Sequence, residues 1–139
     1  MCEKGETEME RILQVKTAKL YEAVDITDQI EGMIEEGEEG FLFVMAPHTS
    51  AALLMGMNLP AAIADNERVT QTMFACARPY LHAGKDGPNA EGHMYSWLHG
   101  NEMILPIEKG KLKLGKLQRI FFVETSGPRN RKVRVFNIK

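Results

Sequence analysis

The sequence predicts a single α+β domain, and three observations support this prediction. Its 139 residues match the usual size of one domain with a hydrophobic core. Hydrophobic residues make up 44% of the chain and charged residues 26%, as in folded globular proteins. Strand-like apolar runs alternate with helical patterns, without an internal repeat or a low-complexity linker. We therefore expect one domain over residues 9–139, preceded by a flexible acidic leader over residues 1–8.

The first half of the domain is predicted to contain strands around one short helix. Residues 12–16 and 20–24 mix apolar and polar side chains, as short strands do. Residues 40–45 and 51–55 are compact apolar runs, which are typical of buried strands. Thr27 is the predicted N-cap of an amphipathic helix between these two pairs of strands. The apolar positions of this helix recur at helical spacing: Ile26, Ile30, Met33 and Ile34.

The second half is predicted to open with a longer helix and to end in strands. Pro60 begins this helix, Arg78-Pro79 ends it, and Cys76 is expected to be buried within it. A glycine-rich loop then precedes one or two helical turns over residues 93–99. The predicted apolar face of the long helix is Ile63, Val69, Met73, Phe74 and Ala77. Strands are expected over residues 103–107, 112–114, 118–125 and 132–138.

The net charge of −2 conceals opposite charges at the two ends of the chain. Residues 1–40 hold 12 acids and 4 bases, whereas residues 109–139 hold 10 bases and 1 acid. Such a basic end can bind nucleic acid or a small anion, or it can pair with the acidic end. A pI of about 6.1 disfavours nucleic acid as a partner. We expect pairing within the molecule or a small anionic ligand.

The sequence also disfavours membrane and secreted proteins. The longest apolar run, residues 41–46, is far shorter than the roughly 20 residues that a membrane helix needs. Cys2 and Cys76 form neither a metal motif nor a disulfide pattern. The polar N-terminus carries no visible secretory signal. These features predict a cytoplasmic protein that does not bind membranes.

Three histidines are candidates for a metal site. His48 directly follows a buried strand, and His82 and His93 flank the predicted loop. Imidazoles from such positions can converge on one ion and leave a fourth position open, as in catalytic zinc sites. The spacing leaves an alternative open, in which His48 is a hydrogen-bonded strand-end residue and the other two are solvated. His99 is expected to pack against the protein or to face solvent.

The basic turn over residues 126–131 is a candidate anion site. Backbone N–H groups near Gly127 and the guanidinium groups of Arg129 and Arg131 can bind phosphate oxygens. The alternative is a solvated basic turn, or one that pairs with acids of residues 1–40. The sequence alone favours this alternative.

Several short motifs follow one another in an order that resembles a known family. They are PHTSAAL over residues 47–53, YLH over 80–82, GPNAEGH over 87–93 and ETSGPRNR over 124–131. Their order and spacing resemble the YjbQ-like family of secondary thiamine-phosphate synthase enzymes over about residues 9–138. The resemblance implies a two-layer β-sandwich of about seven strands with two main helices. It also implies assembly into a homotrimer.

The same resemblance implies a metal and an activity. It implies a divalent metal, most often zinc, held by His48, His82 and His93. It further implies weak thiamine-phosphate synthase activity on phosphorylated and pyrophosphorylated small molecules. A divalent cation (zinc, or magnesium for pyrophosphate chemistry) together with Arg129 and Arg131 would neutralise the leaving pyrophosphate. The resemblance therefore predicts a metal-binding homotrimeric enzyme with a phosphate-bearing ligand.

The sequence departs from the family pattern in two places. Residues 55–60 read MGMNLP where the family commonly has NENxDP, and residues 115–118 read GKLQ in place of GTWQ. A missing acid can remove a general base or a group that orients a histidine. A second hypothesis is therefore a metal- or ligand-binding protein without catalysis. Nucleic-acid binding by the lysines of residues 109–116 is the least favoured hypothesis.

Overall fold

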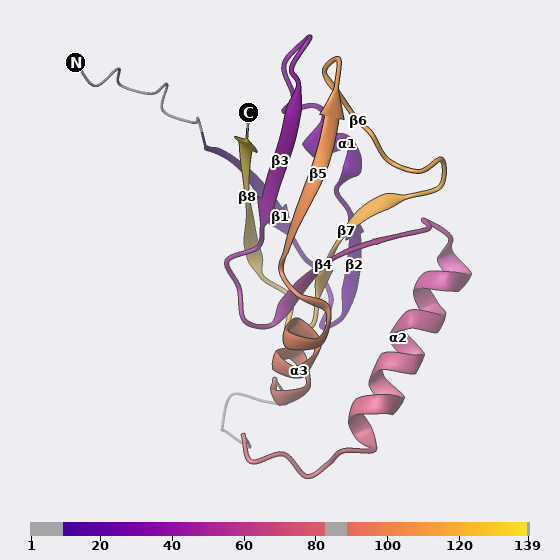
Figure 1. Ribbon diagram of the computed structural model, residues 1–139. Helices are drawn as coiled ribbons and strands as arrows, with labels where there is room; N and C mark the ends of the chain where they lie inside the picture. Colours follow the sequence, from indigo (N-terminus) through magenta and orange to yellow (C-terminus); the bar gives the residue numbers. More distant parts are fainter. Residues whose placement is uncertain (1–9, 83–88, 139) are drawn as a thin grey trace, which may run out of the picture.

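The computed structural model describes residues 10–82 and 89–138, in which the chain forms eight strands and three helices (Figure 1). The strands are β1 (Arg11–Lys16), β2 (Glu22–Asp25), β3 (Gly40–Met45), β4 (Ala51–Gly56), β5 (Glu102–Glu108), β6 (Lys111–Leu112), β7 (Arg119–Glu124) and β8 (Asn130–Ile138). The helices are α1 (Thr27–Glu31), α2 (Pro60–Ala75) and α3 (Ala90–His99). The predicted α+β class is confirmed, and the predicted leader lies outside the described residues.

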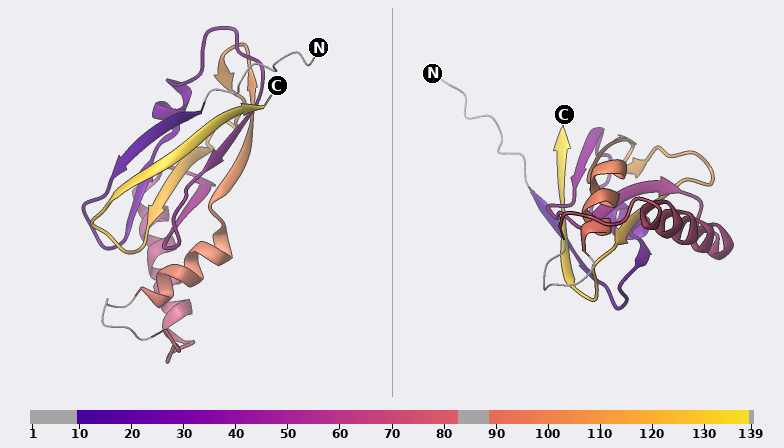
Figure 2. Two further views of the ribbon diagram at one scale, coloured as in Figure 1. Left: turned by 90° about the vertical axis from the view of Figure 1, so that its left-hand side faces the viewer. Right: turned by 90° about the horizontal axis from the view of Figure 1, so that it is seen from below.

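Two antiparallel sheets make up the two layers of the molecule. The larger sheet has the strand order β1-β8-β3-β5-β6, and the smaller has the order β2-β7-β4. β8 lies between β1 and β3, so the last strand is held between two strands from the first half of the chain (Figure 2). In the register of the larger sheet, Phe43 stands opposite Phe136 on one side and opposite Ile104 on the other.

The hydrophobic core fills the space between the two sheets. Successive side chains of a strand point to opposite faces, so each sheet turns one set of side chains inward. Leu42, Val44 and Leu105 come from the larger sheet, and Leu53 and Phe122 come from the smaller one. Burial of each such side chain contributes about 1.5–3 kcal/mol to folding. The two-layer sandwich that the resemblance implied is therefore present.

A second apolar cluster fixes α2 and α3 to the smaller sheet. Phe74 of α2 and Tyr95 of α3 pack with Phe121 and Val123 of β7. The rings of Phe74 and Tyr95 meet edge to face, with their centroids 6.4 Å apart. This contact holds α3 against the strands whose ends carry the candidate site.

The prediction for the start of α1 is wrong. Thr27 is the first residue of the helix, and the N-cap position belongs to Ile26. The Thr27 hydroxyl donates to Asp25 Oδ1 at 2.7 Å and accepts the N–H of Ile120 at 2.7 Å. Because this hydroxyl joins α1 to β7, it does not cap the helix. A threonine hydroxyl can form the same hydrogen bonds at a helix N-cap or between a helix and a strand, so the sequence alone could not distinguish these two roles.

The predicted burial of α2 is also wrong in large part. Phe74 is 9% exposed, but Val69 and Met73 are 53% and 44% exposed. Cys76, just beyond the helix, is exposed as well. The helix stands at the side of the molecule (Figure 1), and its buried residues are Thr70 and Phe74. Because α2 contacts the rest of the protein through few residues, only part of its apolar face is buried.

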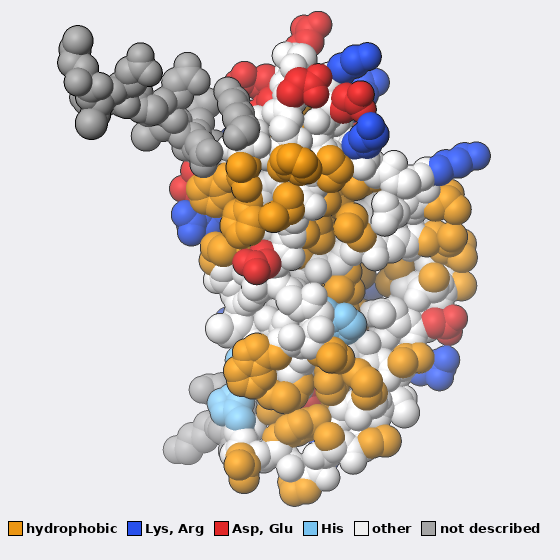
Figure 3. Space-filling view, viewed as in Figure 1, with side chains coloured by type: hydrophobic (Ala, Val, Ile, Leu, Met, Phe, Trp, Pro, Cys, Tyr) orange, Lys and Arg blue, Asp and Glu red, His pale blue; other side chains and the backbone are white. Residues whose placement is uncertain are grey.

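The outer face of the larger sheet is apolar and exposed. Four large side chains on β1, β3, β5 and β8 are between 39% and 59% exposed: Ile12, Phe41, Ile104 and Ile138. Figure 3 shows hydrophobic side chains gathered over β3 and β5. Contiguous apolar surface of this kind often marks a site of association. We refer to these four residues as the outer sheet face.

Basic residues near the C-terminus pair with acids near the N-terminus. Arg119 on β7 contacts Asp25 at 2.8 Å and Asp28 at 3.1 Å. Arg134 on β8 forms an ion pair with Glu10. These contacts confirm the expected pairing within the molecule. In the part of the chain that the structure describes, none of the helices is long and apolar enough to span a bilayer.

Candidate functional site

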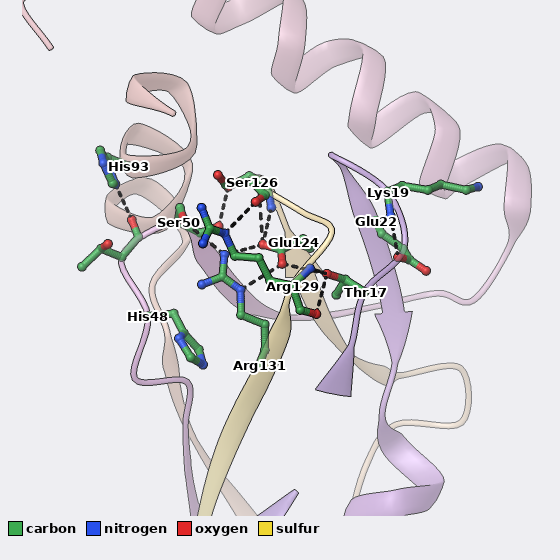
Figure 4. A network of polar contacts seen from close by, with 12 residues as sticks. Thr17, Lys19, Glu22, His48, Ser50, His93, Glu124, Ser126, Arg129 and Arg131 are labelled. Atoms are coloured by element: carbon green, nitrogen blue, oxygen red, sulfur yellow. Dashed lines mark hydrogen bonds and ion pairs between the residues drawn. The ribbon is translucent and has the colours of Figure 1, made fainter. Parts of the chain in front are cut away.

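Polar residues from distant parts of the sequence meet at one end of the two sheets (Figure 4). The β3–β4 connection brings His48 and Ser50, and the end of β7 brings Glu124. The β7–β8 turn brings Arg129, and the first turn of α3 brings His93. The pairing of β4 with β7 sets this arrangement, because both strands reach the same end of the sheet. We refer to this cluster as the sheet-end site.

A buried ion pair lies at the centre of the sheet-end site. Arg131 Nε donates to Glu124 Oε1 at 2.9 Å, and Arg131 Nη2 donates to Glu124 Oε2 at 2.6 Å. Nη2 also lies 3.1 Å from Ser50 Oγ. Burial alone would raise the pKa of Glu124, but hydrogen bonds from Arg131 and Thr17 outweigh burial and lower it. Glu124 is therefore a stable carboxylate and a poor proton acceptor at neutral pH.

Glu124 also fixes the turn that follows it. Its Oε2 accepts the N–H groups of Thr125 at 3.2 Å and Ser126 at 3.3 Å. Thr17 donates its hydroxyl to Glu124 Oε1 at 2.8 Å and accepts the N–H of Arg129 at 2.9 Å. Both ends of the turn are thus tied, directly or through Thr17, to one buried carboxylate.

The three predicted anion-binding residues have different surroundings. The Arg131 guanidinium is occupied by Glu124, and the N–H of Gly127 is used in a backbone hydrogen bond. Arg129 Nε donates to the carbonyl of Ser126 at 2.8 Å, which leaves the two terminal nitrogens of its guanidinium for other partners. Of the three, Arg129 is therefore the best placed to contact an anion.

His82 and His93 lie side by side. Their ring centroids are 5.2 Å apart. His93 Nδ1 lies 2.8 Å from the carbonyl oxygen of Thr49, so Nδ1–H donates there and Nε2 keeps its lone pair. Gly92 permits this approach of α3, because a Cβ at that position would lie 2.6 Å from Thr125 Oγ1.

His48 contacts the backbone of β8. Its Nε2 lies 3.0 Å from the nitrogen and 3.1 Å from the oxygen of Lys132. Burial, followed by the charge of Arg131, lowers the pKa of His48, which keeps the ring neutral at neutral pH. Figure 4 shows the His48 ring directed toward β8, while the His93 ring lies on the other side of the β3–β4 connection.

The structure therefore brings together two of the three predicted metal ligands, His82 and His93. Over residues 10–82 and 89–138, no group of three or more His, Cys, Asp or Glu side chains is placed to hold a metal. His99 packs on Tyr95, with ring centroids 4.4 Å apart, and burial lowers its pKa. This packing agrees with one of the two expectations for His99.

The pairing of Glu124 with Arg131 was missed from the sequence, although a signal for it existed. Glu124 is the one acid among the 10 bases of residues 109–139, and it ends a buried apolar run. A charged residue in such a place is seldom buried without a partner. Thr17 and Ser50 carried no signal, because they meet Glu124 only through the pairing of the strands.

A cavity of about 400 Å³ lies next to the sheet-end site, between α2, α3 and the end of β7. Tyr21, Phe74 and Tyr95 contribute aromatic rings to its wall. Its lining also includes Thr125, which begins the β7–β8 turn. Its size is within the usual range for sites that bind small organic molecules.

Comparison with protein families gives one match over nearly the whole chain. The model described as UPF0047 protein YjbQ-like matches residues 11–139. A UPF0047 protein from Archaeoglobus fulgidus is 39% identical over 121 residues, which cover 87% of this chain and 94% of the relative. The UPF0047 protein YugU from Bacillus subtilis is 33% identical over 128 residues, which cover 88% of this chain and 94% of the relative.

Solved structures resemble the fold closely. A hypothetical protein from Aeropyrum pernix K1 has a TM-score of 0.86 and 30% identity, and the match covers 94% of this chain and 98% of that one. A structure from Sulfolobus solfataricus P2, described as a YbjQ-like protein of unknown function, has a TM-score of 0.83 and 28% identity. That match covers 93% of this chain and 95% of the other.

Proposed function

The chain belongs to the UPF0047 protein YjbQ-like family, and from this premise we propose that it is a metal-dependent protein acting on a small phosphate-bearing anion. The observation that carries the proposal is the adjacent pair of imidazoles, His82 and His93, on the same sheet end as Arg129. The finer proposal is a homotrimeric enzyme with thiamine-phosphate synthase activity.

The His82–His93 pair fits two positions in the coordination shell of a zinc ion. With Zn–N bonds of about 2.0–2.1 Å and tetrahedral angles, two coordinated rings would have centroids about 5 Å apart. The observed separation is 5.2 Å. The hydrogen bond from His93 Nδ1–H to the Thr49 carbonyl is the kind of contact that orients a metal-binding histidine. Neutral imidazoles suit zinc better than magnesium, which prefers oxygen ligands.

Arg129 is proposed to bind the anionic part of the substrate. Its Nε is anchored to Ser126 O, so the terminal nitrogens present a fork that matches two phosphate oxygens. The neighbouring cavity would take the organic part of the substrate against its aromatic wall. A bound divalent metal would supply further positive charge for the anion. Arg131 has a positioning role, because Glu124 occupies its guanidinium.

The proposed reaction places these groups around a departing pyrophosphate. A ring nitrogen of a thiazole phosphate forms a C–N bond to the methylene carbon of a pyrimidine pyrophosphate, and the C–O bond to pyrophosphate breaks. The electron pair of that bond leaves with the pyrophosphate. The Arg129 guanidinium would stabilise the negative charge that develops on the pyrophosphate oxygens in the transition state, which lowers the barrier to cleavage of the C–O bond.

Metal analysis of the purified protein, followed by assay, tests the proposal. We expect bound zinc in the wild type, loss of the metal in His93→Ala and retention in His99→Ala. His99 is the matched control because it lies on the same helix and stacks on Tyr95. Turnover of the two thiamine precursors is then expected to disappear with chelator and with His93→Ala. A wild type without metal, or a His93→Ala variant that keeps it, contradicts the metal site.

The second candidate is a metal- or ligand-binding protein without catalysis. It is favoured by residues 55–60, where the acids of the family pattern are absent. These residues include the Gly56 end of β4, which lies five residue steps along the strand from Ala51, a span of about 17 Å. The absent acids would thus not have stood beside His48 in the same chain. Stoichiometric zinc without turnover of either precursor would support this second candidate.

A further inference from the structure

We propose that the cavity between α2 and α3 binds a neutral aromatic carboxamide, with its ring against the aromatic wall and its amide group on Arg78 and Glu91. The inference shares with the proposed function only the cavity of about 400 Å³, and it needs neither the metal nor the anion. It specifies by chemical class the organic molecule that this cavity takes.

One face of each helix builds the cavity. Residues 70, 74 and 78 recur every four positions along α2 and the turn that follows it, so they lie on one side. Residues 91 and 95 are related in the same way on α3. The C-terminal end of α2 and the beginning of α3 lie at the same end of the molecule (Figure 1). The two helices therefore face each other across the space that the ligand would occupy.

The wall of the cavity presents aromatic rings because its hydroxyl groups are already used. Tyr21 and Tyr95 both line the cavity, and their hydroxyls donate to Asn66 Oδ1 at 2.8 Å and 3.3 Å. The Thr125 hydroxyl donates to the carbonyl of Ser50 at 2.6 Å. The rings of Tyr21 and Tyr95 meet edge to face, with their centroids 6.2 Å apart. Such a wall suits a further aromatic ring, in edge-to-face or offset contact.

An ion pair in the lining supplies a hydrogen-bond donor and an acceptor side by side. Arg78 Nε donates to Glu91 Oε1 at 2.5 Å. This bond leaves the two terminal nitrogens of the Arg78 guanidinium and Glu91 Oε2 available for a ligand. A primary amide carries an acceptor oxygen and a donor nitrogen on one carbon atom. Its oxygen can accept from Arg78 while its N–H donates to Glu91.

The charges of the cavity favour a neutral ligand. Among the described residues that line it, Arg78 and Glu91 are the charged ones, and their charges cancel. Glu91 lies in the first turn of α3, where the helix dipole stabilises a carboxylate. A ligand carboxylate would be repelled by Glu91, and a ligand ammonium group would be repelled by Arg78. An uncharged amide avoids both repulsions and still uses both partners.

Ligand-observed NMR titrations with benzamide, benzoate and acetamide test the inference. We expect benzamide to bind at least about tenfold more tightly than either control, because benzoate lacks the donor and acetamide lacks the ring. Ala75→Trp should abolish benzamide binding, because Ala75 lines the cavity and the indole would fill it. Ala77→Trp is the matched control, since Ala77 is exposed and does not line the cavity.

Glu91→Gln tests the polar contact separately from the shape of the cavity. The glutamine carbonyl can still accept from Arg78 Nε, but Arg78 then has no counter-charge and the repulsion of benzoate is gone. The ratio of benzamide affinity to benzoate affinity should therefore fall by about tenfold or more. Circular dichroism establishes that each variant keeps the wild-type fold.

The outcomes separate this inference from the proposed function. Absence of benzamide binding contradicts the inference, as does equal affinity for either control ligand. Undiminished binding by Ala75→Trp, equal loss in Ala77→Trp, or an unchanged ratio in Glu91→Gln also contradicts it. The titrations are made before and after treatment with chelator, and the same affinities are expected. A protein without zinc that binds benzamide contradicts the metal site alone, and one with zinc that does not bind benzamide contradicts this inference alone.

Discussion

Glu124 and Arg131 show how one pair of residues holds the candidate site. Both side chains are almost fully excluded from solvent, and each accepts or donates further hydrogen bonds beyond the pair. A buried ion pair adds little net stability compared with apolar residues, but the loss of one partner leaves an unpaired buried charge. The pair therefore sets the geometry of the β7–β8 turn and makes that geometry sensitive to substitution.

Glu124→Gln is expected to destabilise the protein by about 3–5 kcal/mol, because it leaves the Arg131 charge buried without a counter-charge. Urea unfolding at pH 7 measures this change. The double variant Glu124→Gln, Arg131→Met removes the unpaired charge and should recover part of the loss. It should not recover all of it, since Thr17 and the turn N–H groups lose their carboxylate acceptor. A single variant as stable as the wild type would show that the pair is not buried.

Asp25 and Glu38 predict the response to acid. Burial alone would raise both pKa values, but hydrogen bonds from Arg119 to Asp25 and from Arg11 to Glu38 outweigh it, and each pKa is lowered to about 2. A carboxyl group whose pKa is lower in the folded state stabilises that state at a pH above its unfolded pKa of about 4. This stabilisation is lost as the pH falls from about 4 to about 2.

Urea midpoints between pH 2 and pH 7 measure this loss. The double variant Asp25→Asn, Glu38→Gln should be less stable at pH 7 and should vary less with pH below 4. Glu36→Gln is the control, because Glu36 is exposed and should leave the pH profile as it is. If the urea midpoint of the double variant falls with pH as steeply as that of the wild type, these two carboxylates are not the cause of the loss of stability in acid.

Among the elements, α3 comes closest to the sheet end at Gly92. A Cβ on Gly92 would lie 2.6 Å from Thr125 Oγ1 and 3.3 Å from Ser50 Cβ, so Gly92→Ala must push α3 away from the sheet end. We expect a loss of about 1–3 kcal/mol in unfolding free energy. His93 would move with the helix, so the zinc content expected under the proposed function should fall too. Gly56→Ala is the matched control, since nothing lies within 4 Å of its Cβ.

Because α2 is buried at few positions, substitutions at two adjacent residues should change the stability of the protein by different amounts. Phe74→Ala should cost about 3 kcal/mol or more, because Phe74 packs in the cluster with Tyr95 and Phe121. Met73→Ala should change stability by less than about 0.5 kcal/mol, because Met73 is largely exposed. Thermal unfolding of the two variants measures the difference. Equal losses at both positions would mean that α2 packs through a broader face than the structure shows.

At the scale of the whole molecule, the outer sheet face predicts association. Phe41→Glu places a charge on this face, and the variant should then have a lower mass than the wild type in size-exclusion chromatography with light scattering, since the proposed association would be lost. Its circular dichroism should stay that of the wild type, because Phe41 lies outside the core between the sheets. Leu117→Glu, in the exposed turn before β7 and outside this face, should leave the mass of the wild-type assembly unchanged. A Phe41→Glu variant with the mass of the wild-type assembly would show that the outer sheet face is not an interface.

Much of the fold was predictable because the strands carry local patterns. The run GFLFVM is β3 and RIFFVE is β7, as their apolar content predicted. Pro60 marked the start of α2 correctly. The burial of Val69, Met73 and Cys76 was not predictable in this way. Periodicity shows which face of a helix is apolar, but the area of the partner surface determines how much of that face is buried.

For the candidate site, the residue types and the elements that carry them could be read from the sequence: a histidine after β3, two more around α3, and an arginine-rich turn before β8. Which of these groups meet depends on how the strands and helices pack. Sheet pairing joined Arg131 to Glu124, the β7–β8 turn joined Arg129 Nε to the Ser126 carbonyl, and the His48 ring turned toward β8. The physical reason is that a side chain's partners come from strand register and helix packing, which join residues as far apart as Ser50 and Arg131.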